Sequence, residues 1–193
     1  MHDIKNIYNQ ELECLESAVK NGKNPYHTFT LATKSSNFPE ARTVVLRDVD
    51  REPLKIYFNA DFRSPKVEEL KNNQLCSALF YDMSRRIQLR FKCKGKLHYQ
   101  NEASIRVWEN TPLQSRKCYM GPYSPSTPLD KWHPNIPMEY LKTDPEREHS
   151  KQGYINFTHI ELEVLESDIL QLHHDGHIRF GLRNGKELIY LSP

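Results

Sequence analysis

The segment from 63 to 66 carries the residue types of an anion-binding helix start. Arg63, Ser64, Pro65 and Lys66 follow one another there. Because serine caps helices well and proline suits the first helical position, the sequence predicts a short helix beginning at this point. Free N–H groups and the helix dipole favour phosphate at such a terminus, and two cations would add to that preference. A capped surface helix with ordinary charges also accounts for these residues, so the local pattern leaves both interpretations open.

Two further arginines lie upstream in a strongly β-prone run. Arg42 stands near the start of residues 41–48 and Arg47 near its end. Side chains alternate across a strand, so this odd offset places the two arginines on opposite faces unless twist or a bulge turns one of them. A ligand shared by both therefore requires such an irregularity.

A basic stripe follows between 86 and 96, where no acidic residue occurs. Its polar members recur at every second position, so a strand would place them on one face. A local basic patch favours a local anion such as phosphate over a long nucleic acid. A solvated face, a ligand or subunit cleft, and the surface of an oligonucleotide-binding barrel all fit the pattern. The stripe comprises Arg86, Gln88, Arg90, Lys92, Lys94 and Lys96.

The elements that would position these residues are mostly strands. Apolar residues at helical spacing predict an amphipathic helix over 3–20. Asp175-Gly176 and Asn184-Gly185 predict two hairpin turns near the end of the chain. Because βαβ alternation is absent, the economical fold is mainly β, an antiparallel barrel with peripheral helices. Strands are predicted over 28–33, 41–48, 54–59, 75–81, 86–100, 156–172, 178–182 and 186–191, with a turn at 50–53 and further helices over 65–72, 102–110 and 138–150.

The length of 193 residues predicts one domain over 1–193. It would consist of the N-terminal helix, a barrel over about 27–100 and 156–193, and an irregular segment, 111–137, with six prolines. A loop that long inside a compact domain is usually functional or mobile.

Composition narrows the class of protein. The net charge is only +2, so the chain as a whole is not a polyelectrolyte. None of the four cysteines forms a CxxC motif, so reduced thiols in the cytoplasm are expected. No apolar run approaches the roughly 18–20 residues of a membrane span, so no membrane partner is expected. Three histidines (His173, His174 and His177) gather near one predicted turn. Because adjacent residues point to opposite faces, no metal site is predicted there.

Four motifs resemble, in order and spacing, the pyridoxamine 5′-phosphate oxidase-like FMN proteins. The resemblance covers most of the chain and returns at the C-terminal hairpin, around Arg179. It implies a split β-barrel and a homodimer with flavin mononucleotide (FMN) at the subunit interface. It also implies a small-molecule substrate and no nucleic-acid partner. The motifs are Arg42-Thr43-Val44-Val45-Leu46-Arg47, Tyr57-Phe58-Asn59, Arg63-Ser64-Pro65-Lys66 and Gln88.

The resemblance also implies residue roles. Arg42 and Lys66 would hold the FMN phosphate, flanked by Arg63 and Ser64. Backbone groups of Tyr57 and Phe58 would meet the flavin ring, Gln88 would reach it from the partner subunit, and Arg179 would lie near the isoalloxazine. Arg47 stands where the family has a lysine that touches flavin and substrate, and with His177 it forms the expected catalytic pair. The expected cofactor-binding residues are Arg42, Thr43, Val44, Arg47, Tyr57, Phe58, Arg63, Ser64, Lys66, Gln88 and Arg179.

Departures from the family pattern concern the substrate more than the cofactor. Pro65 replaces an arginine before the lysine, Ile169 replaces a tryptophan, and Asp175-Gly176-His177 replaces Arg-x-His. Loss of the substrate arginine argues against authentic pyridoxamine phosphate oxidation. The sequence therefore predicts an FMN-dependent oxidoreductase with another substrate, in which the flavin carries the chemistry. A flavin-binding or flavin-storing module and a nucleic-acid-binding barrel without flavin are the alternatives.

Overall fold

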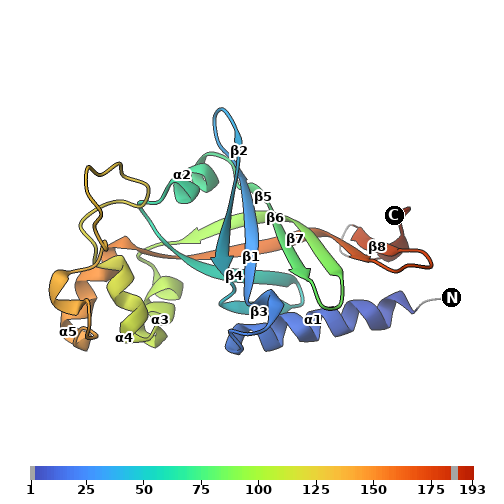
Figure 1. Cartoon of the computed structure of the whole chain (residues 1–193), viewed down its shortest axis with the longest axis horizontal. Coiled ribbons are helices and arrows are strands. Elements are labelled where there is room, and N and C mark those ends of the chain that lie inside the picture. Colours follow the sequence, from blue (N-terminus) through green and yellow to red (C-terminus); the bar gives the residue numbers. More distant parts are fainter. Residues whose placement is uncertain (1–2, 184–186) are drawn as a thin grey trace. The chain divides into compact units, whose positions relative to one another are not determined.

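The chain divides by its contacts into two compact units, and the computed structural model describes residues 3–183 and 187–193. The first unit comprises Met1–Phe58, Asn73–Lys96 and Glu161–Pro193, and the second comprises Asn59–Asn72 and Leu97–Ile160. Three strands continue along the chain from one unit into the other (Figure 1): β4 (Leu54–Asp61), β6 (Ile87–His98) and β7 (Phe157–Gln171). The expectation of one domain over 1–193 stays a prediction.

Antiparallel strands dominate the first unit. Pairing follows the order β2-β1-β5-β6-β7-β4-β3, and β8 joins β7 to β9. The registered pairs, such as β1 with β2 and β5 with β6, are antiparallel. The predicted mainly β, antiparallel fold with peripheral helices is therefore confirmed. The other strands are β1 (Thr28–Lys34), β2 (Pro39–Val45), β3 (Asp48–Arg51), β5 (Leu75–Asp82), β8 (Ile178–Arg183) and β9 (Glu187–Tyr190).

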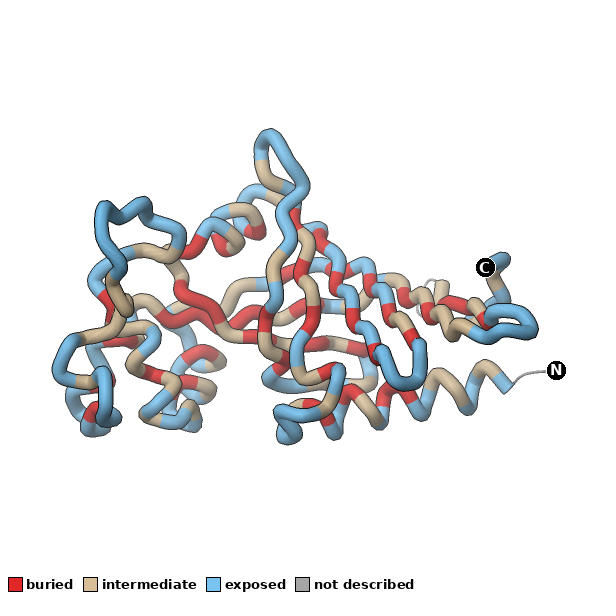
Figure 2. Tube along the Cα trace, in the orientation of Figure 1, coloured by how far each residue is buried: buried red, intermediate tan, exposed pale blue. Residues whose placement is uncertain are grey.

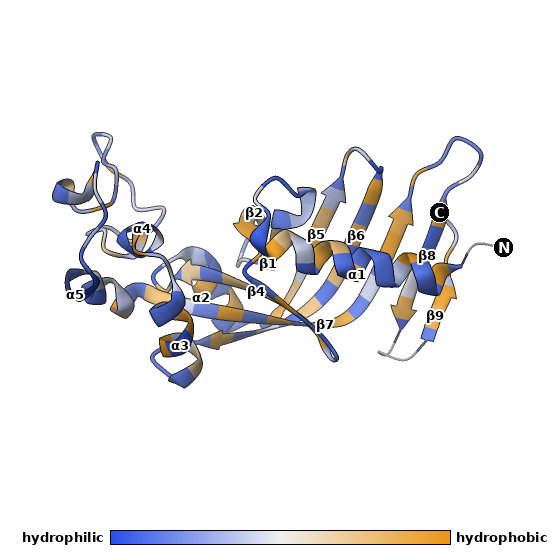
Figure 3. Cartoon of the chain, turned by 90° about the horizontal axis from the view of Figure 1, so that it is seen from below, coloured by the Kyte–Doolittle hydropathy of each residue, from blue (hydrophilic) through white to orange (hydrophobic). Residues whose placement is uncertain are grey.

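Buried and exposed residues alternate along β5 and β6, and the colours by burial in Figure 2 and by hydropathy in Figure 3 follow this alternation. Phe80 of β5 and Phe91 of β6 are buried, and Phe80 stacks on Phe29 with ring centroids 4.8 Å apart. The opposite face of β6 carries Arg90 and its basic neighbours at exposed positions. The period of two seen in the sequence thus places the basic stripe outside the core.

Helix α1 (Ile4–Lys20) is fixed to the first unit by a buried polar network. Glu11 on α1 is only 3% exposed, and its carboxylate accepts hydrogen bonds from the Tyr26 hydroxyl at 2.7 Å and from Arg85 at 2.7 Å. Arg85 also donates to Asp82 Oδ2 at 2.6 Å, and Ser84 donates to Asp82 Oδ1 at 2.7 Å. Buried carboxylates are stable only when paired in this way, so the network ties the helix to the β5–β6 turn.

We expect this network to make stability depend on acid pH. Burial alone would raise the pKa of Asp82, but hydrogen bonds from Ser84 and Arg85 outweigh it and lower the pKa from 3.8 to about 2. The resulting stabilisation is complete above about pH 4 and is lost as pH falls through the folded-state pKa. The shift corresponds to roughly 2 kcal/mol. Urea unfolding between pH 5 and pH 2 should show this loss in the wild type, and an equal loss in Asp82→Asn would contradict the assignment.

The second unit is mainly helical around an aromatic core. Trp108 lies with its ring centroid 5.2 Å from that of Phe157 and 5.8 Å from that of Tyr154. Arg116 is 2% exposed, and its guanidinium lies 4.9 Å from the Trp108 ring centroid. The helices are α2 (Pro65–Asn72), α3 (Glu102–Asn110), α4 (Leu113–Arg116) and α5 (Arg147–Ser150), with 3₁₀ turns at Lys117–Tyr119, Met138–Tyr140 and Lys151–Asn156.

One predicted element was wrong, one is shorter than predicted, and one lies outside the described residues. The helix expected over 138–150 is split into the turn at Met138–Tyr140 and α5. Pro145 explains the break, because proline lacks a backbone N–H and disfavours helical geometry in the residue before it. The turn expected at 50–53 is shorter, since β3 pairs with β4 through Arg51 opposite Leu54. The turn predicted at Asn184-Gly185 lies outside the described residues.

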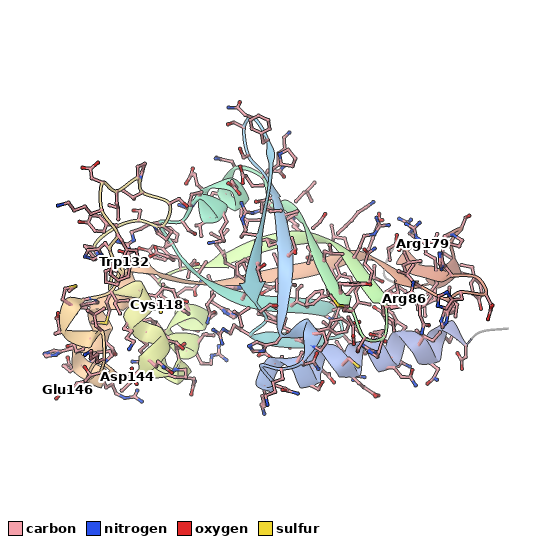
Figure 4. All side chains as sticks on the ribbon, in the orientation of Figure 1. Arg86, Cys118, Trp132, Asp144, Glu146 and Arg179 are labelled. Carbon is pink, nitrogen blue, oxygen red and sulfur yellow. The ribbon has the colours of Figure 1, made fainter. Side chains whose placement is uncertain are left out.

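The proline-rich segment contains a loop closed on itself. A Cβ added to Gly121 would lie 2.0 Å from the Asn135 carbonyl oxygen, so only glycine permits this approach. The Asn135 side chain accepts a hydrogen bond from Tyr123 N and donates one to Tyr123 O, both at 3.0 Å. Between these anchors, Trp132 is 86% exposed (Figure 4).

Within the described residues, no helix is long and apolar enough to cross a membrane.

Candidate functional site

The start of α2 has a buried hydroxyl without a partner. Ser64 N donates to Asp61 O and Ser64 O accepts from Val67 N, both at 3.0 Å, which places Ser64 directly before the helix. The residue is 1% exposed, and its Oγ has no hydrogen-bond partner among the residues that the structure describes. A buried unsatisfied polar group costs about 1–3 kcal/mol. Such a group at a helix N-terminus fits an anion oxygen as its missing partner.

Arg63, the cation directly before Ser64, has its partners inside the second unit. Arg63 contacts both carboxylate oxygens of Asp61, at 3.0 and 2.7 Å, and donates to Gly121 O at 3.1 Å. The hydrogen bond with Asp61 raises the pKa of Arg63. Its guanidinium therefore ties the start of α2 to the loop that begins at Gly121. Lys66, half-buried, follows in the first turn of α2.

The first unit holds the other predicted cofactor residues, and these lie on several strands. Arg42 lies on β2 opposite Leu31 of β1, and its guanidinium donates to the Thr33 hydroxyl. Thr43 is exposed and Val44 is buried on the same strand. β2 ends at Val45, so Arg47 lies outside this strand and the alternation of faces expected between Arg42 and Arg47 does not extend to it.

Arg47 and Tyr57 are brought together. Arg47 is exposed, and its backbone N donates to Tyr57 O at 2.7 Å. The Tyr57 hydroxyl donates to Asp50 at 2.6 Å, and burial together with this carboxylate raises the pKa of Tyr57. Phe58 is buried against Phe29, with ring centroids 6.0 Å apart, so its side chain belongs to the core.

The remaining predicted residues lie on β6, on β8 and in the turn before β8. Gln88 is half-buried on β6 opposite Tyr81 of β5. Arg179, on β8 (Figure 4), donates to Asp168 on β7 at 3.1 and 2.8 Å. His177 is exposed in the turn before β8, and its Nδ1 lies 3.2 Å from the backbone nitrogen of His173.

Two acidic residues were missed by the sequence analysis. Asp61 lies two residues before Arg63, a spacing that would have been visible in the sequence. Asp168 pairs with Arg179 through strand register, since Leu170 is opposite Arg179 and Asp168 is opposite Gly181. Because that pairing depends on how β7 and β8 align, nothing in the sequence marks Asp168 as a partner.

Comparison of structures defines the class of fold. A pyridoxamine 5′-phosphate oxidase-related, FMN-binding protein from Nostoc punctiforme superposes with a TM-score of 0.75 at 19% identity, covering 100% of this chain and 99% of that chain. PhzG from Burkholderia lata, in complex with tetrahydrophenazine-1-carboxylic acid, has a TM-score of 0.67 at 17% identity, covering 97% and 91%. The fold is therefore that of the split-barrel proteins related to pyridoxamine 5′-phosphate oxidase.

Sequence comparison finds a family match over part of the chain. The family model for the FMN-binding domain of pyridoxamine 5′-phosphate oxidase matches residues 9–99. The pyridoxine/pyridoxamine 5′-phosphate oxidase of Psychrobacter sp. is 27% identical over 108 residues, which are 50% of this chain and 49% of that relative. The match thus spans about half the length of this curated relative. Residues 9–99, just under half of the chain, therefore match the family of pyridoxamine 5′-phosphate oxidase FMN-binding domains.

Proposed function

We propose that the protein binds FMN and acts as an FMN-dependent oxidoreductase on a small molecule. The single observation that carries the proposal is the buried Ser64 Oγ without a partner at the start of α2. A phosphate oxygen would satisfy this hydroxyl, and the N-terminus of α2 with Lys66 in its first turn would balance the phosphate charge. The residues present therefore fit the phosphate end of FMN.

Other residues would bind the ring and orient the substrate. Bound FMN supplies hydride or electron-pair transfer at its N5 atom. Backbone groups at Tyr57 and Phe58 would meet the flavin. The exposed Arg47 and His177 would orient or polarise the substrate, because neither is held in the core. Arg42, Thr43, Val44, Gln88 and Arg179 stay predictions of cofactor contacts.

A second copy of the chain is the proposed partner. Leu75 and Leu79 of β5 are 59% and 36% exposed on the same face as the basic stripe. In register, Leu75 is opposite Lys94 and Leu79 is opposite Arg90. An exposed sheet face with apolar residues among cations suits a subunit interface. Light scattering should give about twice the chain mass of 22.8 kDa, and a monomer at micromolar concentration would refute the dimer.

The test of FMN binding is the visible absorption spectrum of the purified protein after FMN is added and the excess removed. Retained flavin bands, lost or strongly reduced in Lys66→Ala, are the expected result. A colourless wild type would refute the proposal and favour a nucleic-acid surface on the basic stripe. Turnover with a panel of amines and reductants then distinguishes an enzyme from a flavin-storing module, because only an enzyme cycles the bound flavin faster than free FMN.

A further inference from the structure

Two carboxylates on β7 are each shared by two cations from the neighbouring strands. Asp168 pairs with Arg90 of β6 at 2.5 Å and with Arg179 of β8 at 2.8 Å. Glu166 pairs with Lys92 of β6 at 2.9 Å and with Arg183 of β8. We call these the Asp168 triad and the Glu166 triad. Each has one negative and two positive groups, so each leaves one net positive charge.

The contacts of Asp168 fix the direction of the Arg179 side chain. Arg179 donates through Nε to Oδ1 at 3.1 Å and through Nη2 to Oδ2 at 2.8 Å, which is the bidentate geometry. Its Nη1 donates to Ser192 O at 3.3 Å. The same Asp168 Oδ2 also accepts from Arg90. Without the carboxylate, two guanidinium groups would face each other and repel.

The two triads border one cleft of about 370 Å³ on the first unit. Its lining includes Arg90, Asp168, Glu166 and Arg183. Leu79 gives the cleft an apolar wall. Arg179 is absent from this lining, and its side chain is 25% exposed. Asp168 therefore connects a cation of the cleft, Arg90, with a cation beside it, Arg179.

We propose that Asp168 is the positioning residue that holds Arg179 in place for the flavin ring, with Arg90 as its second partner. This inference rests on the proposed function, in which Arg179 is a predicted contact of the cofactor. Asp168 acts through Arg179 and need not touch the flavin. The guanidinium keeps its proton at all working pH values, so its position rather than its ionisation is what the carboxylate controls.

The state of Asp168 supports this role. Burial would raise the pKa of Asp168, but hydrogen bonds from Arg179 and Arg90 outweigh it and lower the pKa. Asp168 is therefore ionised at neutral pH and remains a charge-assisted acceptor for both guanidinium groups. The carboxylate is 19% exposed, against 33% for Glu166, so its pairs are less screened by solvent than those of the Glu166 triad.

The experiment compares Asp168→Asn with Glu166→Gln in the full chain. Both variants remove one negative charge from a triad on the same strand, so a general electrostatic effect on FMN would be the same in each. We expect the FMN dissociation constant to rise at least tenfold in Asp168→Asn and to stay within threefold of the wild type in Glu166→Gln. Visible circular dichroism of FMN-saturated protein should change only in Asp168→Asn.

A double-mutant cycle separates positioning from general stability. In an Arg179→Ala background, Asp168→Asn should change the FMN dissociation constant by less than twofold. Equal FMN affinities of Asp168→Asn and Glu166→Gln would overturn this inference but not the proposed function. A loss of FMN that accompanies unfolding, or a change in mass by light scattering, would have the same consequence. Failure of the wild type to hold FMN would overturn the proposed function and this inference together.

Discussion

Ser64→Ala is expected to weaken FMN binding without weakening the fold. The Ser64 hydroxyl is buried without a partner in the described structure, so its removal eliminates an unsatisfied group. The apoprotein should therefore be as stable as the wild type, or more stable by about 1 kcal/mol. A hydrogen bond to a charged phosphate contributes about 1.5–3 kcal/mol. The FMN dissociation constant should accordingly rise roughly 10- to 100-fold.

A matched serine in the same unit provides the control. Ser104 is also fully buried, but its Oγ accepts from Asn101 N at 3.0 Å in the capping box of α3. Ser104→Ala should lower the free energy of unfolding by about 1 kcal/mol and leave FMN affinity unchanged. FMN titration by flavin fluorescence gives the dissociation constant of each variant, and urea unfolding gives the free energy of unfolding of each. Unchanged FMN affinity in Ser64→Ala would refute the phosphate site at α2.

Arg116→Met is expected to be the most destabilising single change in the second unit. The Arg116 side chain donates to Thr111 O at 3.0 Å, Glu109 O at 2.9 Å and Ser150 Oγ at 3.1 Å. Methionine would fill much of the space but remove the donor from all three acceptors, which are two carbonyls where α3 ends and the buried Ser150 hydroxyl. Such losses together cost about 3–5 kcal/mol. The free energy of unfolding in urea should fall by that amount.

An exposed arginine on α3 serves as the reference for this measurement. Arg106 is exposed and its side chain has no hydrogen bond or ion pair among the described contacts. Arg106→Met should therefore change the free energy of unfolding by less than about 0.5 kcal/mol. A similar small change in Arg116→Met would show that water replaces the guanidinium, and that the buried cation is not needed for the packing around Trp108.

Local patterns in the sequence predicted most helices and strands. They did not predict which residues far apart in the chain would contact one another. The period of two in 86–96 and the Ser-Pro start of α2 depend on neighbouring residues, and both appear in the structure. The missing partner of Ser64 could not be foreseen, because it depends on every atom that packs around the hydroxyl. Asp168 was missed for a related reason, since its two arginines lie 78 and 11 residues away along the chain.

The split of the helix expected over 138–150 shows a different limit. Pro145 is visible in the sequence, but apolar and charged residues around it still favoured one weak helix. In the structure the ammonium of Lys117 donates to Tyr140 O at 3.2 Å and to Thr143 O at 3.0 Å. These bonds satisfy carbonyls that a continuous helix would have used internally. A distant cation therefore helps to stabilise the interruption.

The two tryptophans of the chain make intrinsic fluorescence a local reporter. Trp108 is 5% exposed in the core of the second unit, whereas Trp132 is 86% exposed on its closed loop. Emission from Trp108 should lie at shorter wavelength than that of Trp132, because water relaxes around the exposed indole. Replacing Trp132 with phenylalanine leaves Trp108, beside Arg116, as the one tryptophan, and excitation at its long-wavelength edge avoids the ten tyrosines. Quenching by acrylamide would then follow the opening of that core without any added label.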